Sequence, residues 1–323
     1  MIELGLIGAG GITAHLHVPE IRHHPGLFHI RAVADPLPET RERAAAWGAA
    51  YYEDYRELLA EPAIDAVLVA TPHDTHQEIC VAALEAGKHV LVEKPLARTL
   101  DEADAIIAAA EQSGRILLVG HNERYIPAYA HIAELVHSGV LGPLFGARAD
   151  HFQNVTGQGW WGSAQRVGGG CVIGSGIHRL DLLLWYLGAV KEVFAYQRDV
   201  PGRIEAESLC GATIRFNNGA IAEFFCNWGV FAYPYYESLS LFGERGMVCY
   251  DGKTLWLGRN NGSLEATVCS PVRDQWEHFA ACIQWGERPL IGAAEARSAL
   301  ALVQAIYASA SSGHPVAPET MRQ

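Results

Sequence analysis

The sequence lacks the features of a membrane-embedded or nucleic-acid-binding protein. It contains no run of Lys and Arg, and its formal net charge is −12, so it offers nucleic acid no basic surface. Its most apolar helical stretch, residues 180–190, is too short to span a bilayer and contains Asp181. We therefore expect neither nucleic acid nor a membrane among its partners.

Cysteine pairs and metal-binding patterns are also missing. The seven cysteines include no CxxC pair and their number is odd, which argues against a disulfide framework or a structural zinc site. No HxxE, HExxH or carboxylate cluster has credible spacing for a metal site, so we predict no bound metal. The chain begins with MIELGLIGAG, which is typical of a buried strand and leaves no room for a signal peptide. These observations favour a reducing compartment and predict a cytoplasmic protein.

With 323 residues, half of them hydrophobic, the chain is long enough for two domains that each bury a core. In residues 1–121, short apolar runs alternate with helical patterns, and runs such as AVLVA and HVLVE are typical of strands covered on both faces. The predicted strands are 3–7, 29–34, 66–70, 89–93 and 117–120, and the predicted helices are 12–21, 38–47, 75–86 and 100–113. This alternation predicts an α/β fold with a doubly wound parallel sheet of the Rossmann type in residues 1–121.

The pattern changes in residues 122–323, the predicted second domain. Longer alternating strands begin at residue 143, and the hairpin signal Asn217–Gly219 lies between two of them. Further turns are expected at 243–246 and 260–262, and helices are expected at 125–138, 176–187, 275–285 and 293–311. We predict an antiparallel sheet here, and the last helices are candidates for packing back on the first domain.

A glycine-rich turn joins the first predicted strand to the first predicted helix. Gly8 and Gly10 match the dinucleotide fingerprint, in which backbone amides and a helix N-terminus receive the pyrophosphate. The third glycine position of the fingerprint holds Thr13, which departs from it and is expected to loosen helix–strand packing. Asp35 ends the second strand, where a carboxylate binds the ribose 2′-hydroxyl and repels a 2′-phosphate. This favours NAD over NADP, with a plain helix cap as the alternative role of Asp35.

Two further segments follow predicted parallel strands, at the edge where such sheets bind ligands. Thr71, Pro72 and His76 follow one strand, and Glu93-Lys94-Pro95 follows the next. A lysine at that edge can hydrogen-bond a substrate hydroxyl and stabilise a developing alkoxide, whereas an isolated lysine would be a plain exposed strand end. The proline after it is a candidate for a cis peptide bond.

The stretch GGGCVIGSGIHRLD, residues 168–181, has the composition of a catalytic segment. It places His178 near the start of an apolar helix after a glycine-rich turn, which suits a proton carrier. Gly174 stands one helical turn before His178, where a carboxylate would be expected to orient the ring.

Together these segments resemble the Gfo/Idh/MocA oxidoreductase family, named for glucose–fructose oxidoreductase, inositol dehydrogenase and a rhizopine catabolism protein. The resemblance rests on GAGGI at 8–12, TPHDTH at 71–76, AGKHVLVEKPLA at 86–97, NERYIP at 122–127, the 168–181 segment and SGHPV at 312–316. It implies an NAD-binding Rossmann domain and a C-terminal α+β domain whose open, mostly antiparallel sheet binds substrate and forms a homodimer or homotetramer. The implied reaction oxidises a secondary alcohol, or reduces a ketone, of a sugar, cyclitol or sugar derivative.

The resemblance also implies roles for single residues. Lys94 would be the catalytic lysine and His178 the general acid/base, so that His178 takes the substrate proton while Lys94 stabilises the alkoxide. The implied cofactor-binding residues are Gly8, Gly10, Gly11, Ile12, Asp35, Thr71, Pro72, His76, Glu93, Lys94 and Arg124. The implied substrate-binding residues are Lys94, Tyr125, His151, Trp161, Ser175 and His178. Trp161 is equally well explained as a packing residue at the rim.

Gly174 is the departure from the family pattern, because many relatives have aspartate there. Asp181 could orient His178 instead, although it matches a common family position and could equally bind the backbone or Arg179. We expect activity without the first aspartate, and an altered substrate that brings its own polar or acidic group. Two other hypotheses remain: a glycosidase that uses NAD for transient oxidation and elimination, and a nucleotide-binding regulator that has lost catalysis. Retention of both Lys94 and His178 argues against the regulator.

Overall fold

A computed structural model describes residues 1–232 and 237–320. The chain divides into two compact units. Unit 1 contains Met1–His121 and Arg273–Arg297, and unit 2 contains Asn122–Val272 and Ser298–Gln323. A late segment of the chain therefore belongs to the N-terminal unit, and the last helix crosses from one unit to the other.

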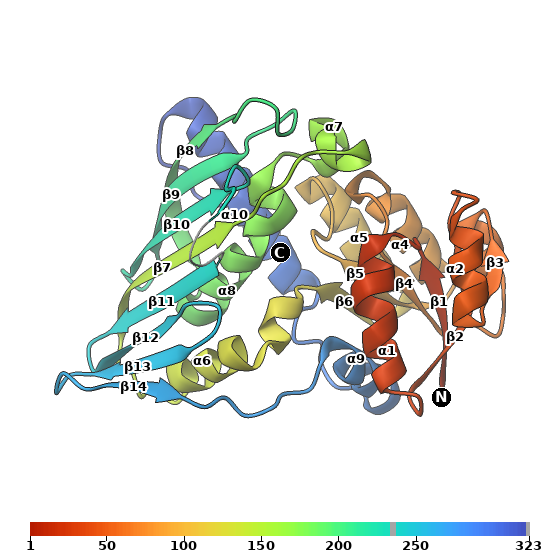
Figure 1. Ribbon diagram of the computed structural model, residues 1–323, viewed down its shortest axis with the longest axis horizontal. Coiled ribbons are helices and arrows are strands. Elements are labelled where there is room, and N and C mark those ends of the chain that lie inside the picture. Colours follow the sequence, from red (N-terminus) through yellow and green to blue (C-terminus); the bar gives the residue numbers. More distant parts are fainter. Residues whose placement is uncertain (233–236, 321–323) are drawn as a thin grey trace. The chain divides into compact units, whose positions relative to one another are not determined.

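Unit 1 is built on a six-stranded parallel sheet with the strand order β3-β2-β1-β4-β5-β6. The strands are β1 (Ile2–Ile7), β2 (Phe28–Ala34), β3 (Ala50–Tyr52), β4 (Ala66–Val69), β5 (His89–Glu93) and β6 (Leu117–Gly120). Every residue of β4 and β6 is buried, as the continuous apolar runs indicated. The predicted doubly wound α/β fold is confirmed, and the order reverses beside β1, where such sheets bind nucleotides (Figure 1).

Five helices of unit 1 lie between these strands in the chain, and a sixth comes much later. They are α1 (Val18–His23), α2 (Thr40–Trp47), α3 (Tyr55–Leu59), α4 (His76–Glu85), α5 (Leu100–Ser113) and the late helix α9 (Gln275–Trp285). The first predicted helix is divided, because residues Thr13–His17 form a π-helical turn ahead of α1. Neither β3 nor α3 was predicted, because segments of three and five residues are too short to show a period.

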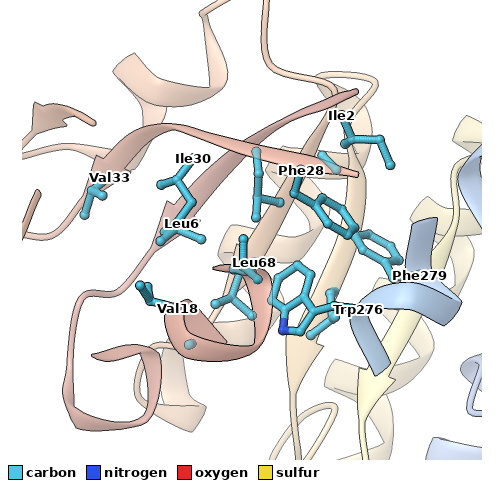
Figure 2. Packing of buried hydrophobic residues seen from close by; sticks show 14 of the residues in the cluster. Ile2, Leu6, Val18, Phe28, Ile30, Val33, Leu68, Trp276 and Phe279 are labelled. Atoms are coloured by element: carbon cyan, nitrogen blue, oxygen red, sulfur yellow. The ribbon is translucent and has the colours of Figure 1, made fainter. Parts of the chain in front are cut away.

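The hydrophobic core of unit 1 includes side chains from α9 (Figure 2). Trp276 is fully buried, and its ring meets Phe28 edge-on with centroids 5.3 Å apart. Phe279 is also fully buried and stacks on Phe28 at 6.5 Å. The carboxylate of Asp274 caps α9 by accepting hydrogen bonds from the amides of Trp276 and Glu277, each at 2.9 Å. A segment from the far end of the chain thus completes the N-terminal core.

Unit 2 contains an eight-stranded sheet with the order β14-β13-β12-β11-β7-β10-β9-β8. The strands are β7 (Leu144–Phe152), β8 (Val190–Arg198), β9 (Leu209–Phe216), β10 (Ile221–Asn227), β11 (Glu237–Gly243), β12 (Gly246–Tyr250), β13 (Leu255–Arg259) and β14 (Leu264–Thr267). All neighbouring pairs are antiparallel except β7 with β10, which is parallel. The prediction of a mostly antiparallel sheet is confirmed, and Gly219 at φ +90° forms the expected turn between β9 and β10.

The remaining helices are α6 (Pro127–His137), α7 (Ala164–Val167), α8 (Ile177–Leu187) and α10 (Ala293–Ser312). In Figure 1, α6, α8 and α10 run along the same face of this sheet. The hydroxyl of Tyr186 on α8 donates to the carbonyl of Tyr129 on α6 at 2.9 Å. On α10, the Ser309 hydroxyl accepts from the amide of Ala195 in β8 at 3.1 Å. The first contact fixes α8, which carries His178, against α6, and the second fixes α10 against the sheet.

Candidate functional site

The glycine turn after β1 is shaped by its contact with the end of β4. Gly8 has φ +94°, and a Cβ atom on it would overlap the carbonyl of Ala70, so only glycine fits. At Gly10 a Cβ atom would meet no atom within 4 Å, which leaves the backbone open to an approaching ligand. Thr13 does not loosen the turn, because its buried hydroxyl donates a 2.7 Å hydrogen bond to the carbonyl of Gly8. Thr13 stands at the third glycine position of the fingerprint, and this hydrogen bond stabilises the turn there.

Asp35, at the end of β2, is tied to the same turn. Its carboxylate accepts hydrogen bonds from the amide of Ala9 at 2.7 Å and from the amide of Leu37 at 2.9 Å. It does not cap α2, whose first turn makes no bond to it. A carboxylate has about four acceptor positions, so two remain for ribose hydroxyls. The open backbone at Gly10 and the acceptor at Asp35 fit a dinucleotide with an unmodified 2′-hydroxyl.

The loops after β4 and β5 are joined by His76. Its ring is fully buried, with Nδ1 2.9 Å from the carbonyl of Pro95 and Nε2 3.0 Å from the carbonyl of Thr71. Burial lowers the pKa of His76, because the interior disfavours the charged ring. His76 thus holds the Thr71 loop against the loop that follows Lys94.

Lys94 lies half-buried between two buried neighbours. The peptide bond from Lys94 to Pro95 is cis, as the sequence suggested, and the Lys94 amide donates to the Glu93 carboxylate at 3.1 Å. The other oxygen of Glu93 is 2.9 Å from Nε2 of His17 in the π-helical turn. Burial by itself would raise the pKa of Glu93, but the bond to His17 and the charge of Lys94 outweigh it and lower that pKa. The cis peptide bond to Pro95 and the hydrogen bond to Glu93 therefore fix the backbone of Lys94.

In unit 2, each glycine of the GGG stretch (residues 168–170) is required for a different structural reason. Gly168 ends α7 with φ +89°, in the left-handed region that glycine favours. Gly169 has φ +147°, and a Cβ atom on it would overlap the hydroxyl of Tyr307. A Cβ atom on Gly170 would overlap the carbonyl of Glu207. The GGG stretch is thus shaped by two residues that the sequence analysis did not select.

Glu207 and Tyr307 hold the segment that leads to His178. Glu207 accepts hydrogen bonds from the amide of Val172 at 3.0 Å and from the Tyr307 hydroxyl at 2.9 Å. Tyr307 in turn accepts from the amide of Ile173 at 3.2 Å. Burial raises the pKa of Glu207 to about 7. No motif surrounds either residue, so no local signal in the sequence marks them.

His178 is half-buried in the first turn of α8, directly after a π-helical turn at Val172–Gly176. The place of a side chain at Gly174 is filled by two indoles: an added Cβ atom would lie 2.6 Å from Cζ2 of Trp228 and 3.1 Å from Cζ3 of Trp161. Ser175 is also engaged, because its hydroxyl accepts from the indole N–H of Trp228 at 2.6 Å. The missing carboxylate has thus left no empty space.

Asp181 forms a buried ion pair with Arg124. Both carboxylate oxygens accept from the guanidinium, each at 2.7 Å, and both side chains are buried. Arg179, the other arginine that the sequence offered to Asp181, forms an ion pair with Glu123. The two arginines of this region are therefore each matched by a buried carboxylate.

The other predicted site residues have varied surroundings. Ile12 is exposed. The backbone of Gly11 is accessible, because a Cβ atom added to Gly11 would meet only His15, at 3.9 Å. Tyr125 is half-buried beside Arg124, and His151 is buried near the end of β7.

Within residues 1–232 and 237–320, no three His, Cys, Asp or Glu side chains are grouped to hold a metal ion. In the same residues no helix has both the length and the apolar character needed to cross a membrane.

Comparison with protein families gives two matches that together cover most of the chain. A family described as "Oxidoreductase family, NAD-binding Rossmann fold" matches residues 2–121, and the GFO/IDH/MocA C-terminal domain matches residues 129–249. The chain belongs to the Gfo/Idh/MocA oxidoreductase family. As a Gfo/Idh/MocA member, it is an NAD-binding oxidoreductase of the dehydrogenase type, as its resemblance to the family implied.

Individual relatives agree with this assignment. The uncharacterized oxidoreductase YrbE of Bacillus subtilis is 31% identical over 264 residues, which is 77% of this chain and 74% of YrbE. The 1,5-anhydro-D-fructose reductase of Ensifer adhaerens is 31% identical over 233 residues, covering 69% of this chain and 68% of the reductase. The structure of levoglucosan dehydrogenase with NADH superposes with a TM-score of 0.91 at 22% identity, covering 99% of this chain and all of that one. Gfo/Idh/MocA relatives thus share both the sequence and the fold.

Proposed function

We propose that the protein transfers hydride between NAD and the carbon of a secondary alcohol or ketone in a sugar, cyclitol or sugar derivative. The proposal rests mainly on Lys94, a half-buried lysine whose backbone is fixed at the ligand-binding edge of a dinucleotide fold. A sugar-derivative reductase among the similar proteins supports the substrate class.

In the proposed reaction, the residues of the chain handle the proton and the developing charge. Lys94 donates a hydrogen bond to the substrate hydroxyl and stabilises the alkoxide as it forms. His178 takes the hydroxyl proton, and it returns the proton when a ketone is reduced. Bound NAD supplies the hydride acceptor, and NADH supplies the donor for the reverse direction. Each alcohol that is oxidised would therefore leave one proton on His178, and bound NAD would accept the hydride.

The remaining predicted residues divide into contact and positioning roles in this proposal. Gly8, Gly10, Gly11 and Ile12 would receive the pyrophosphate, and Asp35 the adenosine ribose. Thr71 and Pro72 would border the nicotinamide half. His76 and Glu93 would act through the loops that they hold, since both side chains are buried and bonded within unit 1.

Tyr125, His151 and Trp161 remain candidates for substrate contact. Arg124 and Asp181 would position the α8 region, because their charges are paired with each other. Ser175 has a smaller role than its place in the sequence suggested, since its hydroxyl already binds Trp228.

Replacement of Lys94 tests the reaction. The Lys94→Met variant should lose about 10²–10⁴-fold in kcat, the range of acid–base and electrostatic catalysis, while NADH affinity stays within about threefold. Lys191→Met, at an exposed lysine of β8, is the matched control and should keep full activity. The assay is nicotinamide absorbance with a panel of sugars, inositols and glycosides. Normal turnover by Lys94→Met would remove the lysine from the mechanism, and glycoside cleavage without net NADH would favour the NAD-dependent glycosidase.

We also propose a homodimer or homotetramer formed through the sheet of unit 2. Two strands of that sheet present exposed apolar side chains on one face, Tyr196 from β8 and Ile221 from the start of β10. A groove on the same sheet is lined by Arg148, Phe194, Tyr196 and Phe225 among others. Such a surface suits a second copy of the chain. Sedimentation of the wild type and of Tyr196→Glu tests this, and a monomeric wild type would refute it.

The compartment is inferred from the thiols. All seven cysteines lie in the described residues and all are free, which suits a reducing compartment such as the cytoplasm.

A further inference from the structure

We propose that His17 is a positioning residue for Lys94, because its buried ring holds the Glu93 carboxylate in place beside the lysine and keeps that carboxylate charged. This inference rests on the proposed function, in which Lys94 stabilises an alkoxide. It adds a residue that none of the sequence motifs selected, and all the groups involved belong to unit 1.

A single turn of backbone joins the glycine loop to this carboxylate. The turn is π-helical, and the carbonyl of Thr13 accepts its closing hydrogen bond from an amide five residues later. At its start, the Thr13 hydroxyl donates to the carbonyl of Gly8 at 2.7 Å. At its end, Nε2 of His17 lies 2.9 Å from Oε1 of Glu93. Such turns are rare and occur frequently at functional sites, so the turn links the nucleotide loop to the end of β5.

The proton on His17 can be assigned from its surroundings. The ring is completely buried, and among the described residues its Nδ1 has no hydrogen-bond partner. An N–H at Nδ1 would be buried without an acceptor, so the stable form is the neutral ring with its proton on Nε2. His17 therefore donates to Glu93 and stabilises the ionised form of that carboxylate.

The ring of His17 is itself fixed by the late helix α9. Trp276 meets it edge-on, with centroids 5.7 Å apart. Val18, the next residue, packs in the same hydrophobic core as Trp276 (Figure 2). Gln275 donates to the carboxylate of Glu20 at 2.9 Å, which ties α9 to α1. His17 therefore directs its N–H from a rigid position that is closed to solvent.

Glu93 transmits this constraint to the lysine. Its Oε2 accepts from the amide of Lys94 at 3.1 Å, and a Cβ atom on Gly120 in β6 would lie 3.3 Å from its Oε1. Burial alone would raise the pKa of Glu93, whereas the hydrogen bond from His17 and the charge of Lys94 lower it. The attraction is mutual, so ionised Glu93 favours the ammonium form of Lys94, which can donate to a developing alkoxide.

Two further titratable groups interact with the charge of Glu93. Glu20 on α1 repels it, and burial raises the pKa of Glu20. His76 on α4 is attracted to it, although burial lowers the pKa of His76 and favours the neutral ring. Within the described part of the chain, His17 is the only side chain that bonds to the Glu93 carboxylate.

The pH dependence of kcat/KM tests the inference, with NAD and a polyol that the wild type oxidises. In His17→Leu nothing replaces the lost hydrogen bond, so Glu93 takes up a proton at a higher pH than in the wild type. We expect kcat/KM to fall about 10–100-fold at pH 6, the cost of a displaced catalytic group, and to recover toward the wild type by pH 9. His17→Gln, whose amide can donate to the same oxygen, should restore activity to within about threefold.

Two other variants separate ionisation from shape. Glu93→Gln cannot ionise, so its loss should be the same at every pH. His23→Leu, at an exposed histidine of α1, is the matched control and should keep the wild-type profile. Urea denaturation and NADH fluorescence titration show that each variant is folded.

A second readout needs no substrate. Acetic anhydride labels the neutral form of an amine, and mass spectrometry compares Lys94 with the exposed Lys191 of the same chain. With the neighbouring charge lost, Lys94 should react about three- to tenfold faster at pH 7 in His17→Leu and Glu93→Gln, since one unit of pKa changes the neutral fraction tenfold. His17→Gln should label like the wild type.

The outcomes separate this inference from the proposed function. Wild-type kcat/KM at every pH in His17→Leu, or wild-type labelling of Lys94, would overturn the inference and leave the oxidoreductase intact. An equal loss at every pH that His17→Gln does not restore would make His17 a packing residue and overturn it as well. If His17→Leu does not fold, wild-type labelling of Lys94 in Glu93→Gln would overturn it. Absence of NADH production from any polyol would overturn the proposed hydride transfer, while faster labelling in His17→Leu would still support the role of His17.

Discussion

The hydroxyl of Tyr307 donates a hydrogen bond to the carboxylate of Glu207 at 2.9 Å, joining residues separated by one hundred positions in the chain. This pair holds the segment that leads to His178, through the amides of Val172 and Ile173. It also explains why Gly169 and Gly170 cannot carry side chains. A positioning role for the pair follows, since neither side chain has to touch the substrate to fix the start of α8.

Stability should depend on the ionisation of Glu207. Its pKa is raised from an ordinary 4.5 to about 7, so the folded state holds a proton that the unfolded chain has already released in this window. The free energy of unfolding should therefore fall as pH rises from about 4.5 to 7, by on the order of 3 kcal/mol, and level off above that. In Glu207→Gln the side-chain oxygen still accepts from Val172 and Tyr307, but the group cannot ionise. Urea denaturation between pH 5 and 8 should show a smaller decline for this variant.

Glu205→Gln is the control for that experiment, because Glu205 is exposed two residues away. It should keep the pH dependence of the wild type. Equal slopes for wild type and Glu207→Gln would mean that Glu207 ionises as freely in the folded protein as in the unfolded chain.

Two glycines of the nucleotide turn should respond differently to alanine. Gly8→Ala places a side chain at φ +94° against the carbonyl of Ala70, so it should lose about 2 kcal/mol of stability or more. Gly10→Ala meets no protein atom within 4 Å, so its stability should change by less than about 0.5 kcal/mol. The new methyl group would nevertheless obstruct the pyrophosphate and weaken NADH binding. Urea denaturation and NADH fluorescence titration measure the two effects, and unaltered NADH affinity in Gly10→Ala would place the phosphates elsewhere.

Gly174 should be coupled to Trp228. Gly174→Ala gains helix propensity of about 1 kcal/mol, but its methyl group overlaps a buried indole, and overpacking typically costs about 1–3 kcal/mol. We expect net destabilisation. Trp228→Phe removes the ring atoms in question, so the double variant should be more stable than the sum of the single effects. A denaturation cycle of the four proteins measures this coupling, and strict additivity would show that the two positions do not compete for space.

The core of unit 1 should depend on α9. Trp276→Ala should cost about 3–5 kcal/mol, because it removes a fully buried indole that packs on Phe28. Trp285 lies on the same helix with 70% of its surface exposed, so Trp285→Ala should change stability by less than about 0.5 kcal/mol. Urea denaturation compares the two. A fragment of residues 1–121 should also be unstable, and a stably folded fragment would contradict the contribution of α9.

Local sequence determined the elements with a clear period or a clear stop signal. Strand β5 and helix α5 begin and end where the sequence predicted, since a continuous apolar run specifies the one, and the Thr99 cap and Gly114 specify the other. The Rossmann turn and the cis Lys94–Pro95 bond were also predicted, because special backbone geometry requires glycine or proline. The roles of Lys94 and His178 remain predictions, as do those of the other site residues.

The tertiary structure decided the relationships that join distant parts of the chain. The last helices were candidates for packing on the first domain, but no local pattern could show that Trp276 and Phe279 enter its core, pair Arg124 with Asp181, or bring Tyr307 and Glu207 against the GGG stretch. The sequence by itself marked Gly174 as a missing carboxylate, and only the fold placed the indoles of Trp161 and Trp228 in that position. The physical reason is that periodicity and capping depend on neighbours in the chain, whereas packing and buried ion pairs depend on which surfaces meet after folding.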